Sequence, residues 1–223
     1  MIQVFKPILF STPMVKAILN GEKTMTHRIP NGNIRNKYYE YEEMARVIGC
    51  GDGVVYSLTE REFYEQYPPY AVEDILWVRE TWANAYLNGG PDGFIDAFAY
   101  RADGAITYPY DAHLKYSDSK VSDLHASAIS GWRPSIHMPK KACRLFLRVT
   151  DVRMERLHCI SGNLDELECE GINIIVGAFQ ASWNFAGLWD RTVKPSDIGT
   201  LGWDANPWVW VIQFERTERP DSF

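Results

Sequence analysis

Long apolar runs, paired cysteines and an excess of basic residues are all missing from this sequence of 223 residues. No stretch approaches the roughly 20 apolar residues of a membrane-spanning helix, and the opening MIQVFKPILF lacks the order of a secretion signal. The cysteines form no CxxC pair and lie at Cys50, Cys143, Cys159 and Cys169. Such spacing favours neither a zinc site nor a disulfide framework. We therefore expect a cytoplasmic protein that does not contact a membrane.

Metal-binding motifs and a basic surface are also missing. The five histidines form neither an H-x-H nor an HExxH motif, so we expect no metal and no cofactor. The formal net charge is −6, whereas proteins that coat duplex nucleic acid neutralise many phosphates with clustered Lys and Arg. A broad phosphate-binding face is therefore not expected. A local basic pocket for one nucleotide, a short single strand or a small anion stays open.

Residues typical of helix starts and ends, together with the spacing of apolar residues, predict three short helices. Pro13 suits the first turn of one helix and Gly21 its end. Asn163 suits the start of a second helix, and Gly171 its end. A third helix is predicted within 178–189, where apolar residues recur at helical spacing.

Bulky or alternating residues predict three strands, at 74–82, 144–155 and 207–216. The segments at about 29–70 and 84–135 are rich in turn dipeptides and keep no sustained period, so we interpret both as insertions. Insertions of this length in a compact domain are usually functional or binding segments. The apolar content of 46% is ample for one core. We expect a single α+β domain over the whole chain, with two long insertions.

The segment NGEKTMTHR, residues 20–28, places a lysine close to two threonines, a histidine and an arginine. Lys23 and Thr26 are three positions apart, which in an ideal strand puts them on opposite faces, whereas a turn or bulge brings them together. A desolvated lysine can act as a base beside an attacking hydroxyl. The alternative is a solvated turn whose charges face water, and the spacing alone is neutral between the two.

The segment WRPSIHMP combines two prolines with polar and aromatic side chains. The prolines stiffen its backbone, so Trp132, Ser135 and His137 are candidates for contacts with a stacked base. The alternative is a loop that only covers the core.

Two further segments hold candidate ligand contacts. Tyr100 in YRADG can stack on a base, or can belong to a plain turn. Trp77 and Arg79 in WVRETW are candidates for the mouth of a cleft, although core packing is the alternative for the tryptophan.

NGEKTMTHR resembles the G-x-K-x-x-[ET]-x-R signature of ASCH domains, relatives of the PUA RNA-binding fold, with Gly21, Lys23, Thr26 and Arg28 filling the pattern. DILWVRETW, YRADG, WRPSIHMP, ECEGI and NPWVWVIQF are similar to blocks of a large phage and prophage group of ASCH-related proteins. His27 stands where that group commonly has arginine. The resemblance implies a PUA-like, partly open β-barrel with flanking short helices, in the cytoplasm of a bacterial host cell.

The resemblance also implies a nucleic-acid component as ligand: a modified base, a nucleoside or single-stranded RNA. The candidate contacts for it are Arg28, Trp77, Arg79, Tyr100, Trp132, Ser135 and His137. A different implication is a phage accessory or assembly protein, whose aromatic-rich cleft binds a protein partner.

A third implication is catalysis, because a small bacterial enzyme group in this superfamily hydrolyses N4-acetylcytidine with a lysine, a threonine and a downstream glutamate. Carried over, these are Lys23, Thr26 and Glu170 in ECEGI. The hydroxyl or a water would attack the amide, Lys23 would relay a proton, and Glu170 would protonate the leaving amine. An amidohydrolase or an RNA-processing hydrolase is thus an alternative to simple binding.

Overall fold

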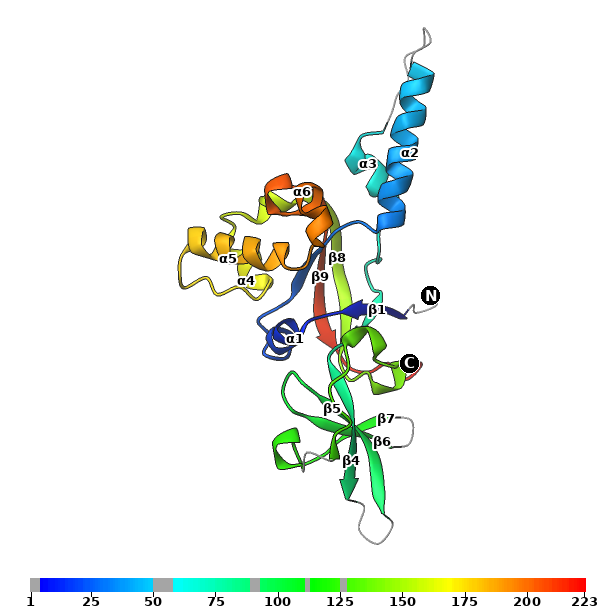
Figure 1. Ribbon diagram of the computed structural model, residues 1–223, viewed down its shortest axis with the longest axis vertical. Coiled ribbons are helices and arrows are strands. Elements are labelled where there is room, and N and C mark those ends of the chain that lie inside the picture. Colours follow the sequence, from blue (N-terminus) through cyan, green and yellow to red (C-terminus); the bar gives the residue numbers. More distant parts are fainter. Residues whose placement is uncertain (1–4, 50–57, 89–92, 111–112, 125–127) are drawn as a thin grey trace. The chain divides into compact units, whose positions relative to one another are not determined.

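The computed structural model describes residues 5–49, 58–88, 93–110, 113–124 and 128–223, and it has a mixed α+β fold with two sheets (Figure 1). The α+β class expected from the sequence is confirmed. Its contacts divide the chain into two compact units. Unit 1 comprises Met1–Lys23, Asp74–Arg148 and Glu215–Phe223, and unit 2 comprises Thr24–Glu73 and Val149–Phe214. Each unit buries apolar clusters of its own.

The first sheet has the strand order β1-β3-β8-β9-β2. Its strands are β1 (Phe5–Leu9), β2 (Met25–Arg28), β3 (Ile75–Arg79), β8 (Phe146–Arg156) and β9 (Trp208–Thr217). Within unit 1, β1 pairs parallel with β3, and β3 pairs antiparallel with β8. Within unit 2, β2 pairs antiparallel with β9. The three strands predicted from the sequence are therefore confirmed, although the first ends at Arg79 and Trp82 begins a strand of the second sheet.

The second sheet is an antiparallel meander in unit 1 with the order β4-β5-β6-β7. Its strands are β4 (Trp82–Asn88), β5 (Phe94–Tyr100), β6 (Ile106–Tyr110) and β7 (His113–Tyr116). The sequence interpretation of 84–135 as turn-rich missed this sheet. Four alanines and Ile106 form its buried cluster, and alanine carries little strand propensity.

A partly buried ion cluster in unit 1 connects Glu80 between β3 and β4, Asp103 between β5 and β6, and Arg144 before β8. The Arg144 guanidinium donates to both carboxylate oxygens of Glu80, at 2.9 and 3.0 Å, and to both of Asp103, at 2.8 and 2.9 Å. Arg144 also lies over the Tyr100 ring, 4.0 Å from its centroid. Both carboxylates bind the guanidinium in bidentate fashion, so the buried Arg144 and Glu80 charges have a direct partner, whereas Asp103 is exposed.

Several of the helix ends coincide with local sequence signals. The helices are α1 (Thr12–Leu19), α2 (Gly32–Gly49), α3 (Glu60–Tyr64), α4 (Leu164–Cys169), α5 (Ala178–Asp190) and α6 (Ile198–Leu201). Gly21 and Gly171 follow α1 and α4 with φ of 79° each, in the left-handed region that glycine adopts without strain. The Asn163 side chain caps α4 by accepting the Glu166 N–H at 3.2 Å. The three predicted short helices are therefore confirmed.

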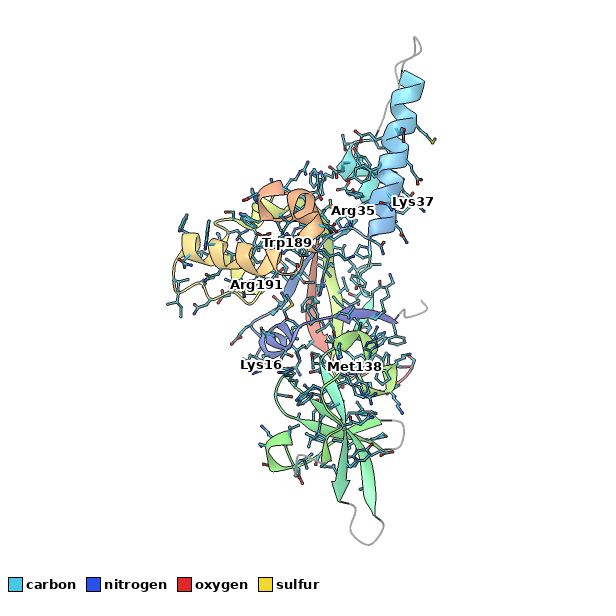
Figure 2. The ribbon with its side chains drawn as sticks, viewed as in Figure 1. Lys16, Arg35, Lys37, Met138, Trp189 and Arg191 are labelled. Carbon is cyan, nitrogen blue, oxygen red and sulfur yellow. The ribbon has the colours of Figure 1, made fainter. Side chains whose placement is uncertain are left out.

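Short 3₁₀ segments connect these elements, among them Val121–Asp123, Ser135–His137, Lys140–Ala142, Leu157–Ile160, Pro195–Asp197 and Trp203–Ala205. In unit 2, α4 lies beside α5 (Figure 1). Trp189, near the end of α5 (Figure 2), is buried and donates its indole N–H to the Leu201 carbonyl at 2.8 Å. This bond fixes α6 against α5. Across the described ranges, no helix has both the length and the apolar character to cross a membrane.

The segment at 29–70 contains a helix pair that the sequence interpretation left as local structure. Tyr38 and Tyr41 on α2 lie at helical spacing, and their rings are 5.5 and 5.3 Å from the Phe63 ring on α3. Thr59 begins α3 with a capping box to Glu62. The two helices thus pack through an aromatic cluster of their own.

Candidate functional site

The residues predicted as site residues are divided between the two units. Unit 2 holds Thr26, Arg28 and Glu170. Unit 1 holds Lys23, Trp77, Arg79, Tyr100, Trp132, Ser135 and His137.

In unit 2 the candidate site is built on β2 and the end of α4. The Thr24 N–H donates to the Cys169 carbonyl at 2.8 Å, which fastens the start of β2 to the last residue of α4. On its other side β2 pairs with β9, with Thr26 opposite Ile212. Glu170 is the C-cap of α4, directly before the positive-φ Gly171. The turn at that glycine therefore lies beside the edge strand.

The Glu170 carboxylate is bound to His27, a residue that sequence reasoning did not assign to the site. Its Oε1 accepts the His27 backbone N–H at 2.7 Å and lies 2.6 Å from the His27 Nδ1. Because an ionised carboxylate only accepts hydrogen bonds, this contact places a proton on the His27 Nδ1. The two side chains are 2% and 5% exposed. The Phe185 ring meets the imidazole edge-on, at 5.6 Å and 69°.

The neighbours of His27 on β2 face the other way. Successive side chains of a strand point to opposite faces, so Thr26 and Arg28 share a face that His27 does not. Thr26 and His27 are both buried. The alternative of a solvated turn is therefore wrong for these residues, and also for Lys23, which is 2% exposed in unit 1.

Arg28 adds a half-buried cation to this group. Burial lowers the pKa of its guanidinium below the usual value, while the nearby Tyr70 and Glu170 side chains act in the opposite direction. Glu170 therefore interacts electrostatically with Arg28 as well as through hydrogen bonds with His27. Of the predicted residues of unit 2, Arg28 and Glu170 therefore lie close enough to interact, and Glu170 has a partner in His27 that the resemblance did not supply.

In unit 1, Tyr100, one of the predicted ligand contacts, is part of the buried core. Tyr100 is fully buried, and its hydroxyl bonds the Ala142 carbonyl and the Thr107 hydroxyl, at 2.8 Å each. Stacking of a base on Tyr100 would require this packing to open, because Arg144 already covers the ring.

The other unit 1 candidates lie nearer the surface. Arg79 lies over the Trp77 ring, 5.5 Å from its centroid, and its guanidinium donates to the Ile136 carbonyl. This bond brings the Ser135–His137 turn to β3. Trp132 is 37% exposed and His137 is exposed. The sequence indicated WVRETW and WRPSIHMP as candidate binding segments but did not predict the contact between them.

A separate pocket of about 320 Å³ lies in unit 2 beside α5. Its lining residues are Ser161, Gly162, Ala178, Phe179, Ser182, Trp183 and Trp203. The sequence signal for it was the spacing of Phe179 and Trp183, which predicted the helix but not the pocket. Together the two sites concentrate polar and aromatic groups in unit 2.

Comparisons of the chain with protein-family models, curated proteins and solved structures found no match. In the part of the chain that the structure describes, no group of three or more His, Cys, Asp or Glu side chains is placed to hold a metal ion. Cys50 lies outside the described residues.

Proposed function

We propose that this protein is an ASCH-type protein with a PUA-like, partly open barrel, and that it binds a nucleic-acid component at β2. The observation that carries the proposal is the polar cluster in unit 2. Of the four polar or charged residues buried in the described part of that unit, three are Thr26, His27 and Glu170, and the fourth is Ser182. Burying such groups costs free energy, and strongly perturbed or buried ionisable groups concentrate at functional sites.

The chemistry of this cluster suits the edge of a base. Arg28 offers several donors in a fixed fork, and the Thr26 hydroxyl both donates and accepts. Base edges carry donors and acceptors side by side, so they match such a set. The net charge of −6 opposes a wide electrostatic interface. Affinity therefore comes from local contacts, and a modified base, a nucleoside or a short single strand is the ligand.

Hydrolysis of N4-acylated cytosine nucleosides is a second candidate, and the His27–Glu170 pair favours it. A carboxylate that holds Nδ1–H keeps an imidazole in the tautomer whose Nε2 takes a proton. In this reaction His27 Nε2 takes a proton from a water, the hydroxide attacks the acyl carbon, and the C–N bond breaks. The imidazolium then returns its proton to the exocyclic nitrogen. Glu170 positions the base here, instead of protonating the leaving amine.

Isothermal titration with cytidine, N4-acetylcytidine and a short single-stranded RNA tests the binding proposal. Arg28→Ala should weaken binding of whichever ligand the wild type binds. The matched control is Arg191→Ala, which removes the same charge from an exposed position at the end of α5 (Figure 2). Equal affinity of the wild type and Arg28→Ala would contradict the proposal, as would an equal loss in both variants.

Chromatographic detection of cytidine released from N4-acetylcytidine tests the second candidate. His27→Gln should abolish turnover, and Glu170→Gln should lower kcat more than it changes KM, because it acts only through the imidazole. Absence of turnover by the wild type would remove the hydrolase and leave the binding proposal standing.

A further inference from the structure

Two aromatic side chains on α5 stand in solvent. Phe179 is 82% exposed and Trp183 is 67% exposed, and they lie one helical turn apart. Their rings are nearly parallel, at 18°, with centroids 6.5 Å apart. A flat ligand parallel to one ring is therefore parallel to the other. Single exposed apolar residues are ordinary, but contiguous ones mark a binding surface.

The pocket beside α5 continues this surface inward. Its volume of about 320 Å³ lies at the lower end of the range of about 300–1,000 Å³ for small-molecule sites. Trp203 forms part of its wall and is held by neighbouring rings, His158 at 4.5 Å and Phe185 at 6.0 Å. Three aromatic side chains therefore surround one small pocket, and one of them is fixed before any ligand arrives.

The polar groups around the pocket are neutral. Ser161 and Ser182 contribute hydroxyls, and Ser182 is fixed by bonds to the Ala178 carbonyl at 2.8 Å and the Gly162 N–H at 3.0 Å. None of the described residues that line the pocket is charged. A phosphate or a carboxylate would find no counter-charge in this lining. The ligand group that fits is flat, aromatic and uncharged.

An amide pair runs alongside the aromatic pair on the same helix. Gln180 and Asn184 follow Phe179 and Trp183 by one position each, and the Gln180 Nε2 donates to the Asn184 Oδ1 at 2.9 Å. Amide side chains carry both donors and acceptors and bond base edges. A surface that bound an apolar protein partner by hydrophobic contact alone would not need a row of amide side chains beside its aromatic rings.

We propose that Phe179, Trp183 and the pocket beside them bind one base of a single-stranded nucleic acid, as a second contact beside the site at β2. This inference rests on the proposed function, and it names a single strand as the ligand. The base stacks on the exposed rings, and its edge faces the amides and hydroxyls. Stacking needs no charged residues, which agrees with the acidic net charge.

Fluorescence anisotropy with a labelled ten-nucleotide single-stranded RNA tests this inference. Removing a stacking ring costs about 1–3 kcal/mol per base, so Trp183→Ala should weaken affinity about 5- to 150-fold. Trp183→Phe keeps a ring and should retain most of the affinity. Leu188→Ala is the matched control, because Leu188 is an exposed apolar residue of the same helix outside the pocket lining. The fold-loss should be equal at low and high salt, since no ion pair is removed.

The outcomes separate this inference from the binding proposal. Equal affinity of wild type and Trp183→Ala, with a loss in Arg28→Ala, overturns the α5 site and keeps the site at β2. No binding of RNA by the wild type overturns the α5 site, while nucleoside titration decides the site at β2 independently. If Trp183→Ala abolishes self-association in light scattering but leaves RNA affinity intact, the rings form a protein interface and the inference is wrong.

Discussion

Truncating Glu170 tests how much the polar pair stabilises unit 2. The carboxylate accepts two hydrogen bonds from His27, at 2.6 and 2.7 Å, and its side chain is 5% exposed. Hydrogen bonds to charged groups contribute about 1.5–3 kcal/mol each, and breaking a buried pair costs about 3–5 kcal/mol. Glu170→Ala should therefore lower the free energy of unfolding by about 3–5 kcal/mol.

Urea denaturation measured by circular dichroism gives this free energy. Glu170→Gln keeps one acceptor oxygen but loses the charge and gains an NH2 group, so its loss should be about 1–2 kcal/mol. Glu168→Ala is the control, because Glu168 is exposed on the same helix, and surface substitutions usually change stability by less than about 0.5 kcal/mol. A loss below about 1 kcal/mol in Glu170→Ala would refute the reasoning, because two buried donors would then have found other acceptors.

Three further predictions concern unit 1. Arg144→Met leaves the Glu80 carboxylate buried without its guanidinium, so urea denaturation should show a loss of about 3–5 kcal/mol. Burial raises the pKa of Asp103, but the hydrogen bonds and charge of Arg144 outweigh it and the net pKa lies below 3.8. The stability from Asp103 is therefore present above pH 3.8 and lost as the pH falls toward the folded-state pKa. Asp103→Asn should flatten this part of the acid-unfolding curve. Burial raises the pKa of the Cys143 thiol to about 12, so iodoacetamide at neutral pH should label the exposed Cys159 before Cys143, as read by peptide mass spectrometry.

Each of these predictions has a control in the same chain. Arg148 pairs with Glu215 at a site where both side chains are about half exposed, so Arg148→Met should cost less than about 1 kcal/mol. Asp118 is exposed, and Asp118→Asn should leave the acid-unfolding curve unchanged. Labelling in urea should make Cys143 react as fast as Cys159. Equal losses in Arg144→Met and Arg148→Met, an unchanged acid curve in Asp103→Asn, or early labelling of Cys143 would contradict the corresponding argument.

Local signals in the sequence determined much of the secondary structure. Pro13 and Gly21 bound the first helix, and Asn163 and Gly171 bound another, because capping and positive φ depend on residues within one turn. The alternation of apolar and polar residues at 144–155 predicted β8, because successive side chains of a strand point to opposite faces. The alanine-rich strands at 84–135 escaped prediction, because their burial depends on pairing between strands and not on the side chains themselves.

The sequence also marked residues 20–28 as bearing reactive side chains, and the resemblance to the ASCH superfamily added Glu170. Only the tertiary structure decided that Glu170 binds His27, because the two residues are 143 positions apart and their contact requires β2 to lie against the end of α4. Similarly, the spacing of Phe179 and Trp183 determined a helix, but which side of that helix meets solvent depends on what α5 packs against. Trp189 on the same helix is buried, whereas Trp183 is exposed. Composition and spacing therefore determine which side chains are available for chemistry, and packing decides which of them meet one another and which meet a ligand.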